Sequence, residues 1–243
     1  MTQQSWRVAK LLERGQDAAM PRILPFALFM VFIGLESLIR WIVGFTSSSE
    51  TSLSPVFVWL YPVRIAVVLG ALVYLWPAYQ ELRDPICINT GEALLVVVAG
   101  GLVYVAWVRM DWPWAMQGQP TGYNPFQAGA SVGIVLAGIR LFGAAVVVPV
   151  MEELFWRSFL IRYLVTPAFT TVRLGTFTPL SFSATVVLFG LEHHLWLAGM
   201  MAGVVYNLLL YKTRRLWPGV LAHAITNLCL GIHVLVTGEW HWW

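Results

Sequence analysis

Long runs of apolar residues, separated by short polar or turn-forming stretches, dominate this chain. About 20 consecutive apolar residues are enough for a helix to cross the hydrocarbon core of a bilayer. The runs that meet or approach this length cover residues 23–45, 57–79, 91–108, 128–165, 181–197, 198–211 and 216–236. The pattern predicts an all-α polytopic membrane bundle of seven transmembrane helices, or of eight if the long run 128–165 is divided.

The composition of the chain agrees with a lipid environment. Of its 243 residues, 58% are hydrophobic and only 11% are charged, and the mean hydropathy is +0.71. Soluble domains are about a quarter charged, so a soluble protein of this size would need more charge on its surface. The net charge of +3 is too small and too dispersed for a nucleic-acid-binding protein. The two cysteines, Cys87 and Cys229, form neither a metal-binding nor a redox pattern.

Basic residues between the apolar runs predict the topology, because cytoplasmic loops of membrane proteins carry an excess of lysine and arginine. With the N-terminus inside, the cytoplasmic segments hold Arg7, Lys10, Arg14, Arg22, Arg83, Arg162, Arg173, Lys212, Arg214 and Arg215. The opposite segments hold only Arg109 and, near a span boundary, Arg140. We therefore expect an integral membrane protein with a cytoplasmic N-terminus and an outer C-terminus.

The same pattern predicts the domain organisation. Residues 1–22 mix charged and apolar positions, which is typical of an amphipathic cytoplasmic segment at the membrane surface. Residues 23–236 form one transmembrane domain, and the polar residues with candidate chemistry make residues 141–230 its catalytic core. Residues 237–243 form a C-terminal tail.

Ionisable residues inside the first two spans have a structural interpretation. A charge in a bilayer is costly and faces the bundle interior, where it finds a partner. Glu36 and Arg40 are one helical turn apart and can neutralise each other. Arg64 in the second span either extends to the interface or pairs with Glu36.

The fourth span carries two adjacent glutamates, of which only one has a partner in its own helix. Glu153 and Arg157 are one helical turn apart and share a face. Glu152 is rotated by about 100° from Glu153 and has no such partner. A lone carboxylate in an apolar pocket is suited to act as a general base.

Three polar residues in later spans are predicted to lie at the depth of Glu152. If the fourth span covers residues 141–161, a rise of about 1.5 Å per residue puts Glu152 roughly 14 Å from its cytoplasmic end. By the same rise His193 lies roughly 18 Å deep in its span, and His223 and Asn227 lie roughly 10 and 16 Å deep in the last one. The four residues are therefore expected to meet in one layer near the midplane.

Three motifs in this order resemble those of the CPBP family: Glu-Glu-x-x-x-Arg at 152–157, Phe-x-x-x-His at 189–193 and His-x-x-x-Asn at 223–227. That family comprises type II CAAX prenyl proteases and bacteriocin-processing or immunity relatives, all of them intramembrane. Stretches of the N-terminal half, at 25–30 and 79–82, are similar to the bacterial CAAX-protease-related subgroup associated with exosortase sorting systems. The resemblance to the subgroup implies the inner membrane of a bacterium.

The resemblance implies an intramembrane endopeptidase, and the residues favour the glutamic type. In that family resemblance, Glu152 and His193 would activate a water. His223 and Asn227 would hold the oxyanion, and Glu153 and Arg157 would support the site. The residue chemistry agrees, because a carboxylate near a histidine can deprotonate water and paired side-chain donors can stabilise an oxyanion. His194, which adjoins His193, is an alternative histidine in a shifted register.

A zinc mechanism is the alternative to this metal-free one. Glu152, His193 and His223 could form the two-histidine, one-glutamate ligand set of a catalytic zinc site. However, the chain has no His-Glu-x-x-His helix, and Asn227 is a poor zinc ligand but a good oxyanion donor. The sequence therefore favours a mechanism without a cofactor and leaves zinc open.

The expected partners are the lipid bilayer and a membrane-anchored or transmembrane peptide substrate, in a cavity open toward the cytoplasm or laterally. The resemblance to the subgroup favours a C-terminal sorting tail as that substrate, and a prenylated peptide is the alternative. Two other functions compete with the protease. One is a non-catalytic scaffold or immunity-type protein with the same fold. The other is a proton-coupled transporter, which predicts internal repeats, and none is visible in the sequence.

Overall fold

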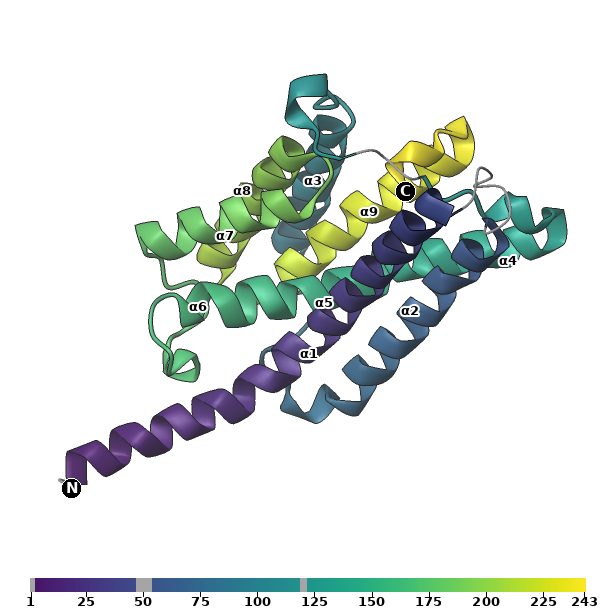
Figure 1. Cartoon of the computed structure of the whole chain (residues 1–243). Coiled ribbons are helices and arrows are strands. Elements are labelled where there is room, and N and C mark those ends of the chain that lie inside the picture. Colours follow the sequence, from purple (N-terminus) through teal and green to yellow (C-terminus); the bar gives the residue numbers. More distant parts are fainter. Residues whose placement is uncertain (1–2, 47–53, 119–121) are drawn as a thin grey trace.

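The structure is a computed structural model that describes residues 3–46, 54–118 and 122–243, with side chains for 18–42, 57–118 and 122–243. These residues lie in helices, turns and irregular segments, with no strand among them, which confirms the predicted all-α class (Figure 1). The long helices are α1 (Gln3–Thr46), α2 (Ser54–Tyr74), α3 (Thr90–Trp107), α4 (Ala130–Phe142), α7 (Pro179–Glu192), α8 (Trp196–Thr213) and α9 (Trp217–Thr237). Shorter elements are α5 (Val148–Glu153), α6 (Ile161–Tyr163), η2 (Trp76–Ala78), η3 (Gln80–Leu82), η4 (Pro113–Ala115), η5 (Pro125–Ala128), η8 (Phe169–Thr171) and η9 (Trp240–Trp242).

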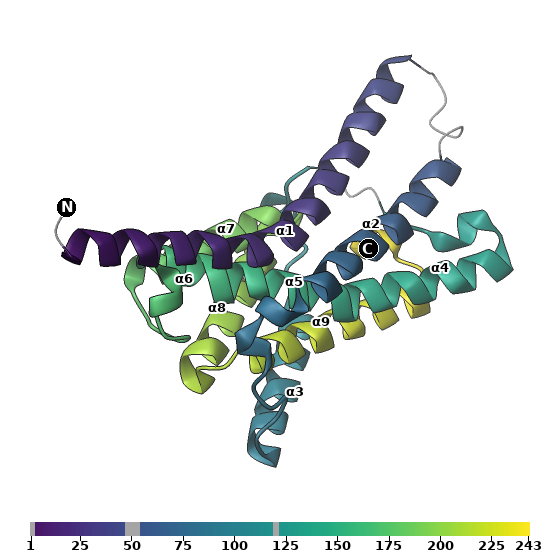
Figure 2. The same cartoon turned by 90° about the horizontal axis from the view of Figure 1, so that it is seen from below.

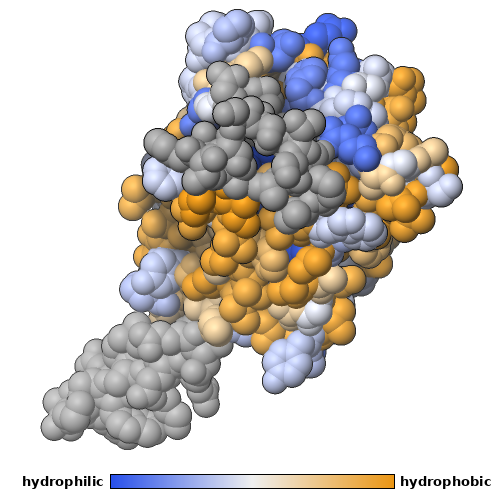
Figure 3. Space-filling view, turned by 45° about the vertical axis from the view of Figure 1, so that its right-hand side comes forward, coloured by the Kyte–Doolittle hydropathy of each residue, from blue (hydrophilic) through white to orange (hydrophobic). Residues whose placement is uncertain are grey.

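Five helical stretches are long and apolar enough to cross a membrane: Ala18–Ile42, Phe57–Tyr74, Thr90–Trp107, Ala130–Tyr163 and Trp217–Thr237. The predicted spans 181–197 and 198–211 correspond to α7, a shorter apolar helix, and to α8. Large apolar side chains are exposed along the helices, and Figure 3 shows a mostly hydrophobic surface with hydrophilic residues gathered near one end. Apolar surface of this extent is favourable in lipid, not in water. The protein is therefore an integral membrane helical bundle.

The first predicted span is only part of a longer helix. α1 continues without a break from Gln3 to Thr46, across the boundary at residue 22 between the predicted N-terminal segment and the first predicted span. Hydropathy marks where a helix enters lipid, not where its backbone hydrogen bonding ends. Pro21 and Pro25 lie inside α1, which bends along its length in Figure 2, as helices that contain proline usually do. The side chains of residues 1–17 lie outside the described ones, so their amphipathic arrangement stays a prediction.

The long apolar run 128–165 is not divided. It is helical from Ala130 to Tyr163, with two wider π-helical turns, η6 at Gly143–Val147 and η7 at Leu154–Leu160. Pro149, which has no backbone N–H to donate, follows the first wide turn, and the helix continues past it. The eight-span alternative needed a turn inside this run and is wrong. The two π turns lie on either side of the glutamate pair, a placement often seen at functional sites.

α7 and α8 form a hairpin whose turn determines the position of His193. The Oγ1 of Thr178 caps α7 by accepting a backbone N–H at 3.1 Å. His193 is the C-terminal cap of α7, with extended backbone angles, so the predicted turn at 195–199 begins earlier and His193 lies beside a helix end, not inside a span. Gly190 lets the two helices approach closely, because a Cβ there would lie 2.7 Å from the carbonyl oxygen of Trp196.

Buried ion pairs close one end of the bundle. Arg22 on α1 forms a bidentate ion pair with Glu81 in η3, with Nη2–Oε2 at 2.6 Å and Nε–Oε1 at 2.7 Å. The hydroxyl of Ser158 donates to Glu81 and accepts from Arg162 Nη2 at 2.8 Å. Burial alone would raise the pKa of Glu81, but the hydrogen bonds from Arg22 and Ser158 hold it below its ordinary value. Arg22 and Arg162 are therefore buried and anchored, not solvated loop charges.

Further contacts join the loops near the two ends of the bundle. Arg215, between α8 and α9, is buried and pairs with Glu92 at the start of α3, with Nη1–Oε1 at 2.7 Å, and it lies near the first end. At the opposite end Tyr123 lies 6.5 Å, ring to ring, from Trp243 of the C-terminal tail. These contacts do not identify which end is cytoplasmic, so the orientation stays a prediction.

Candidate active site

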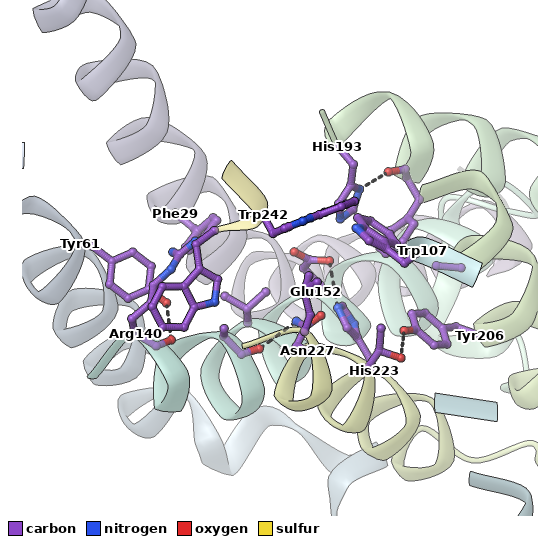
Figure 4. Close-up of a pocket in the computed structure, with 17 residues that line it drawn as sticks. Phe29, Tyr61, Trp107, Arg140, Glu152, His193, Tyr206, His223, Asn227 and Trp242 are labelled. Carbon is purple, nitrogen blue, oxygen red and sulfur yellow. Dashed lines mark hydrogen bonds and ion pairs between the residues drawn. The ribbon is translucent and has the colours of Figure 1, made fainter. Parts of the chain in front are cut away.

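A cavity of about 200 Å³ lies between the helices, and the four predicted catalytic residues all line it. They are Glu152 from α5, His193 from the α7–α8 turn, and His223 and Asn227 from α9. Figure 4 shows Glu152 in the middle, with His193, His223 and Asn227 around it. The common depth estimated from the sequence corresponds to a common cavity in the structure.

Glu152 differs from the other buried carboxylates in having no hydrogen-bond partner. The residue is 4% exposed, and its Oε2 atom is buried without a partner among the described residues. His223 Nε2 lies 4.0 Å from this Oε2 atom. That distance is too long for a direct hydrogen bond, but a single water beside both atoms can bind both of them.

Glu153 lies behind the cavity and joins two other residues. Its Oε1 accepts from Arg157 Nη1 at 3.0 Å and from His223 Nδ1 at 3.2 Å. Arg157 also donates from Nε to Asn207 Oδ1 at 3.2 Å, and Asn207 donates to Thr185 at 3.0 Å. This chain of contacts fixes the predicted Glu153–Arg157 pair to α7 and α8, and it shows a contact to His223 that helical spacing did not predict.

Glycine and aromatic rings hold His223 in place. Gly219, one turn earlier on α9, leaves space for Glu153, because a Cβ there would lie 3.0 Å from Glu153 Oε2. The ring of Tyr206 stacks on His223 at 5.0 Å between centroids and 20° between planes. The hydroxyl of Tyr206 donates to Thr226 Oγ1 at 2.9 Å, which anchors the ring. The imidazole of His223 is thereby held on its face and at its Nδ1 atom.

His193 has a defined tautomer. Its Nδ1 lies 2.7 Å from the carbonyl oxygen of Phe189, which can only accept, so the proton is on Nδ1. The Nε2 atom of a neutral His193 is then free to accept a proton. Phe189 and Trp107 flank the ring at 4.7 Å and 5.3 Å between centroids. The spacing of the Phe-x-x-x-His motif therefore has a direct structural cause, a backbone hydrogen bond at a helix end.

Asn227 is anchored by the first π turn. Its Nδ2 donates to the carbonyl oxygen of Ala144, in η6, at 2.8 Å. The amide nitrogen carries two N–H groups, so a second donor is left for a ligand in the cavity. The sequence predicted Asn227 as a donor but gave no indication of the carbonyl that orients it.

Glu192 and His194 adjoin His193 but do not line the cavity. Glu192 Oε2 accepts from Trp156 Nε1 at 3.0 Å, which gives this carboxylate a structural partner. His194 Nδ1 contacts the carbonyl oxygen of Gln117. The shifted register with His194 in the site is therefore not the arrangement found.

The residues predicted as zinc ligands do not form a ligand set in the structure. Among the described residues, no group of three or more His, Cys, Asp and Glu side chains is arranged to hold a metal ion. The Nδ1 of His223 contacts Glu153 and the Nδ1 of His193 contacts a backbone carbonyl, so each ring has only Nε2 available. Each free Nε2 is left for a ligand in the cavity, so the zinc mechanism stays an alternative to be tested.

The C-terminal tail contributes cavity residues that the sequence motifs did not indicate. Trp242 and Trp243 line the cavity together with Tyr61 and Arg140. Figure 4 shows Tyr61 and Arg140 on the side of Glu152 away from Tyr206. The cavity thus extends toward the tail end of the bundle, the predicted outer end, whereas the sequence suggested an opening toward the cytoplasm or between helices.

Comparison with known proteins gives one match. Residues 134–229 match the family model described as type II CAAX prenyl endopeptidase Rce1-like. The matched range is less than half of the chain, and it includes all seven residues of the three motifs. It confirms the resemblance of this region to the CPBP family, and it supports a CAAX-type intramembrane protease acting on a membrane-associated substrate. No curated protein and no solved structure shows significant similarity to the chain.

Proposed function

We propose that this protein is an intramembrane endopeptidase of the glutamic type, with Glu152 as the general base. The observation that carries the proposal is the state of Glu152, a buried carboxylate without a hydrogen-bond partner in a cavity lined by two histidines and an asparagine. A buried polar atom without a partner is costly, so its retention in a polar cavity is typical of a functional group. The family match to a CAAX-type protease supports the same function.

In the proposed first step, Glu152 takes a proton from a water while the water oxygen attacks the carbonyl carbon of the peptide. His193 assists through Nε2, which its backbone contact leaves free to accept. The π electrons of the carbonyl move onto its oxygen, which becomes an oxyanion. The electron pair of the oxyanion then re-forms the carbonyl while the C–N bond pair leaves with the nitrogen, and Glu152 returns its proton to that departing amine, so that protons and electrons balance.

His223 and Asn227 are proposed to hold the oxyanion. Asn227 can donate its second N–H, because the first is bound to Ala144. His223 can donate from Nε2 only when both ring nitrogens carry protons, since Nδ1–H faces Glu153. The carboxylate of Glu153 favours that charged imidazole, so its proposed role is to position and polarise His223.

A hydrophobic C-terminal sorting tail of an exported protein is the proposed substrate, in a bacterial inner membrane with the N-terminus inside. Two features support this choice over a cytoplasmic prenylated end. The cavity lies among membrane helices, and it extends to the end of the bundle that the charge pattern predicts to be outside. A prenylated C-terminal peptide is the alternative to be compared with it.

The test compares Glu152→Gln with Glu192→Gln in the full chain, purified in nanodiscs. Both substitutions change one carboxylate to an amide, at the buried Glu152 and the half-buried Glu192, but only Glu152 lines the cavity. General-base catalysis typically contributes about 10²–10⁴-fold, so Glu152→Gln is expected to lower kcat by that factor. Glu192→Gln should retain cleavage of the same hydrophobic tails, measured by mass spectrometry.

Undiminished cleavage by Glu152→Gln would show that Glu152 is not the base. Cleavage of prenylated peptides but not of hydrophobic tails would refute the proposed substrate while leaving the mechanism intact. A wild-type protein that binds both peptide sets and cleaves neither would instead be a non-catalytic scaffold.

A further inference from the structure

A second cavity, of about 230 Å³, adjoins the first, and its lining carries an excess of positive charge. Its charged residues are three arginines and one glutamate, namely Arg40, Arg64, Arg140 and Glu36. Tyr61, Arg140 and Trp243 line both cavities, so the two spaces share a wall and meet at these side chains.

Two of the three arginines have no acidic partner. Arg40 pairs with Glu36, with Nη2–Oε1 at 2.8 Å, as the sequence predicted. The carboxylate of Glu36 is therefore already paired, although the sequence also made it a possible partner of Arg64. Among the described side chains, neither Arg64 nor Arg140 forms an ion pair, and the Nε atom of each is buried without a hydrogen-bond partner.

Aromatic rings hold these two guanidinium groups without neutralising them. Arg64 is 8% exposed and lies over the rings of Phe29 and Tyr61, at 4.6 and 4.9 Å from their centroids. Arg140 lies over the ring of Tyr61 from 4.2 Å. Tyr123, which also lines the cavity, is neutral, because burial raises the pKa of its phenol to about 12 and its hydroxyl donates to the Val58 carbonyl. The cavity therefore holds two positive charges without a counter-charge.

We propose that Arg64 and Arg140 form a carboxylate-binding subsite that holds the substrate peptide beside the catalytic cavity. Guanidinium groups match carboxylates in shape and bind them through paired, charge-assisted hydrogen bonds. A peptide carboxylate held here would fix the distance from that end of the substrate to the bond beside Glu152. The subsite rests on the proposed function and extends it, because it assigns the residues that select and position the substrate.

A peptide carboxylate is favoured over a lipid phosphate by the shared wall of the two cavities. Arg140 faces both spaces, so a ligand bound to it lies next to the catalytic cavity and not on the outer surface of the bundle. The carboxylate has two sources in a peptide, the chain end and an acidic side chain. The subsite chemistry is the same for both, and the experiment separates them.

The first experiment measures binding without catalysis. The full chain carrying Glu152→Gln, in phosphatidylcholine nanodiscs, is titrated with N-dodecanoyl-glycine, its glycinamide counterpart and dodecyl phosphate, with empty nanodiscs as a background. The carboxylate should bind at least about tenfold more tightly than the amide, since hydrogen bonds to charged groups contribute about that factor. Adding Arg64→Gln or Arg140→Gln should abolish the difference, whereas adding Arg109→Gln, at an exposed loop arginine, should not.

Equal binding of the carboxylate and the amide would overturn the proposal, and so would a preference that survives both arginine substitutions. Tighter binding of dodecyl phosphate than of the carboxylate would make the site a lipid headgroup site and refute a peptide subsite. Arg64→Lys, which keeps the charge but loses the forked donor, should retain part of the preference. It provides a folded variant if Arg64→Gln does not fold, as judged by gel filtration.

The second experiment identifies the source and separates this proposal from the proposed function. One hydrophobic tail peptide is used with a free C-terminus, with an amidated C-terminus, and amidated with one internal glutamate. If amidation abolishes binding and the internal glutamate does not restore it, the subsite binds the chain end. If the glutamate restores binding, the subsite also accepts an acidic side chain. If the arginine variants cleave all three peptides as the wild type does, the subsite is wrong and the protease stands. If arginine-dependent binding occurs without any cleavage, the subsite stands and the protease is wrong.

Discussion

Glu152 and Glu153 are adjacent in the chain, yet the structure predicts opposite consequences for the same substitution. Glu153→Gln removes the charge that neutralises Arg157, which is 1% exposed, and it weakens the contact to His223. Breaking one partner of a buried pair costs about 3–5 kcal/mol, and because glutamine keeps one acceptor we expect about 3 kcal/mol. For a chain of this size that corresponds to a fall in Tm of roughly 6–12 °C.

Glu152→Gln is the matched control for this prediction. Glu152 makes no hydrogen bond, and its contact to His223 Nε2 spans 4.0 Å, so replacing its charge by an amide removes only this long ion pair. Its Tm should equal or exceed that of the wild type. Thermal unfolding of both variants in nanodiscs, followed by tryptophan fluorescence, measures the two values. A similar loss of stability in both variants, or a larger one for Glu152→Gln, would show that the pairing of Arg157 does not carry the stability assigned to it.

Three further predictions concern packing, pH and metal. Gly190→Leu should separate α7 from α8, because a Cβ at this position would lie 2.3 Å from a Met200 side-chain atom, and it should lower the free energy of unfolding by about 1–3 kcal/mol or more. Gly101→Leu, at a position with open space around it, is the control. Equal Tm values for the two variants would contradict the close approach of the helices. Because the pKa of Glu81 is lowered in the folded protein, its ionised form adds stability that is complete above the ordinary glutamate pKa of 4.5 and is lost as pH falls through the lowered pKa. Glu81→Gln should therefore flatten the fall in Tm between pH 6 and pH 3. A steeper fall in the variant would be the contrary result. Cleavage should persist after dialysis against EDTA, and activity that vanishes and returns with added zinc would restore the zinc mechanism.

The sequence alone was sufficient for the fold class and for the candidate residues, because both depend on local information. Hydropathy over about 20 residues reports transfer into lipid, so the apolar runs located the membrane helices. Helical spacing reports which side chains share a face, so the Glu153–Arg157 and Glu36–Arg40 pairs were predicted and are formed. The three motifs indicated the family that the match over residues 134–229 supports.

The same local information misplaced the boundaries. The first helix starts in the polar segment before residue 23, because hydropathy does not report backbone hydrogen bonding. His193 lies at a helix end, since its position depends on how closely Gly190 lets α8 approach.

What only the tertiary structure decided is which polar groups are left without partners. Glu153, which helical spacing already pairs with Arg157, also binds His223 of another helix, and Glu36 binds Arg40 and not Arg64. Spacing along one helix gives the available pairs, but the choice among pairs on different helices depends on distances across the bundle. In a medium with little water, a polar group that packing leaves unpaired is a candidate for binding a ligand. Glu152 and the two arginines beside its cavity are such groups, and the proposed chemistry and its substrate subsite rest on them.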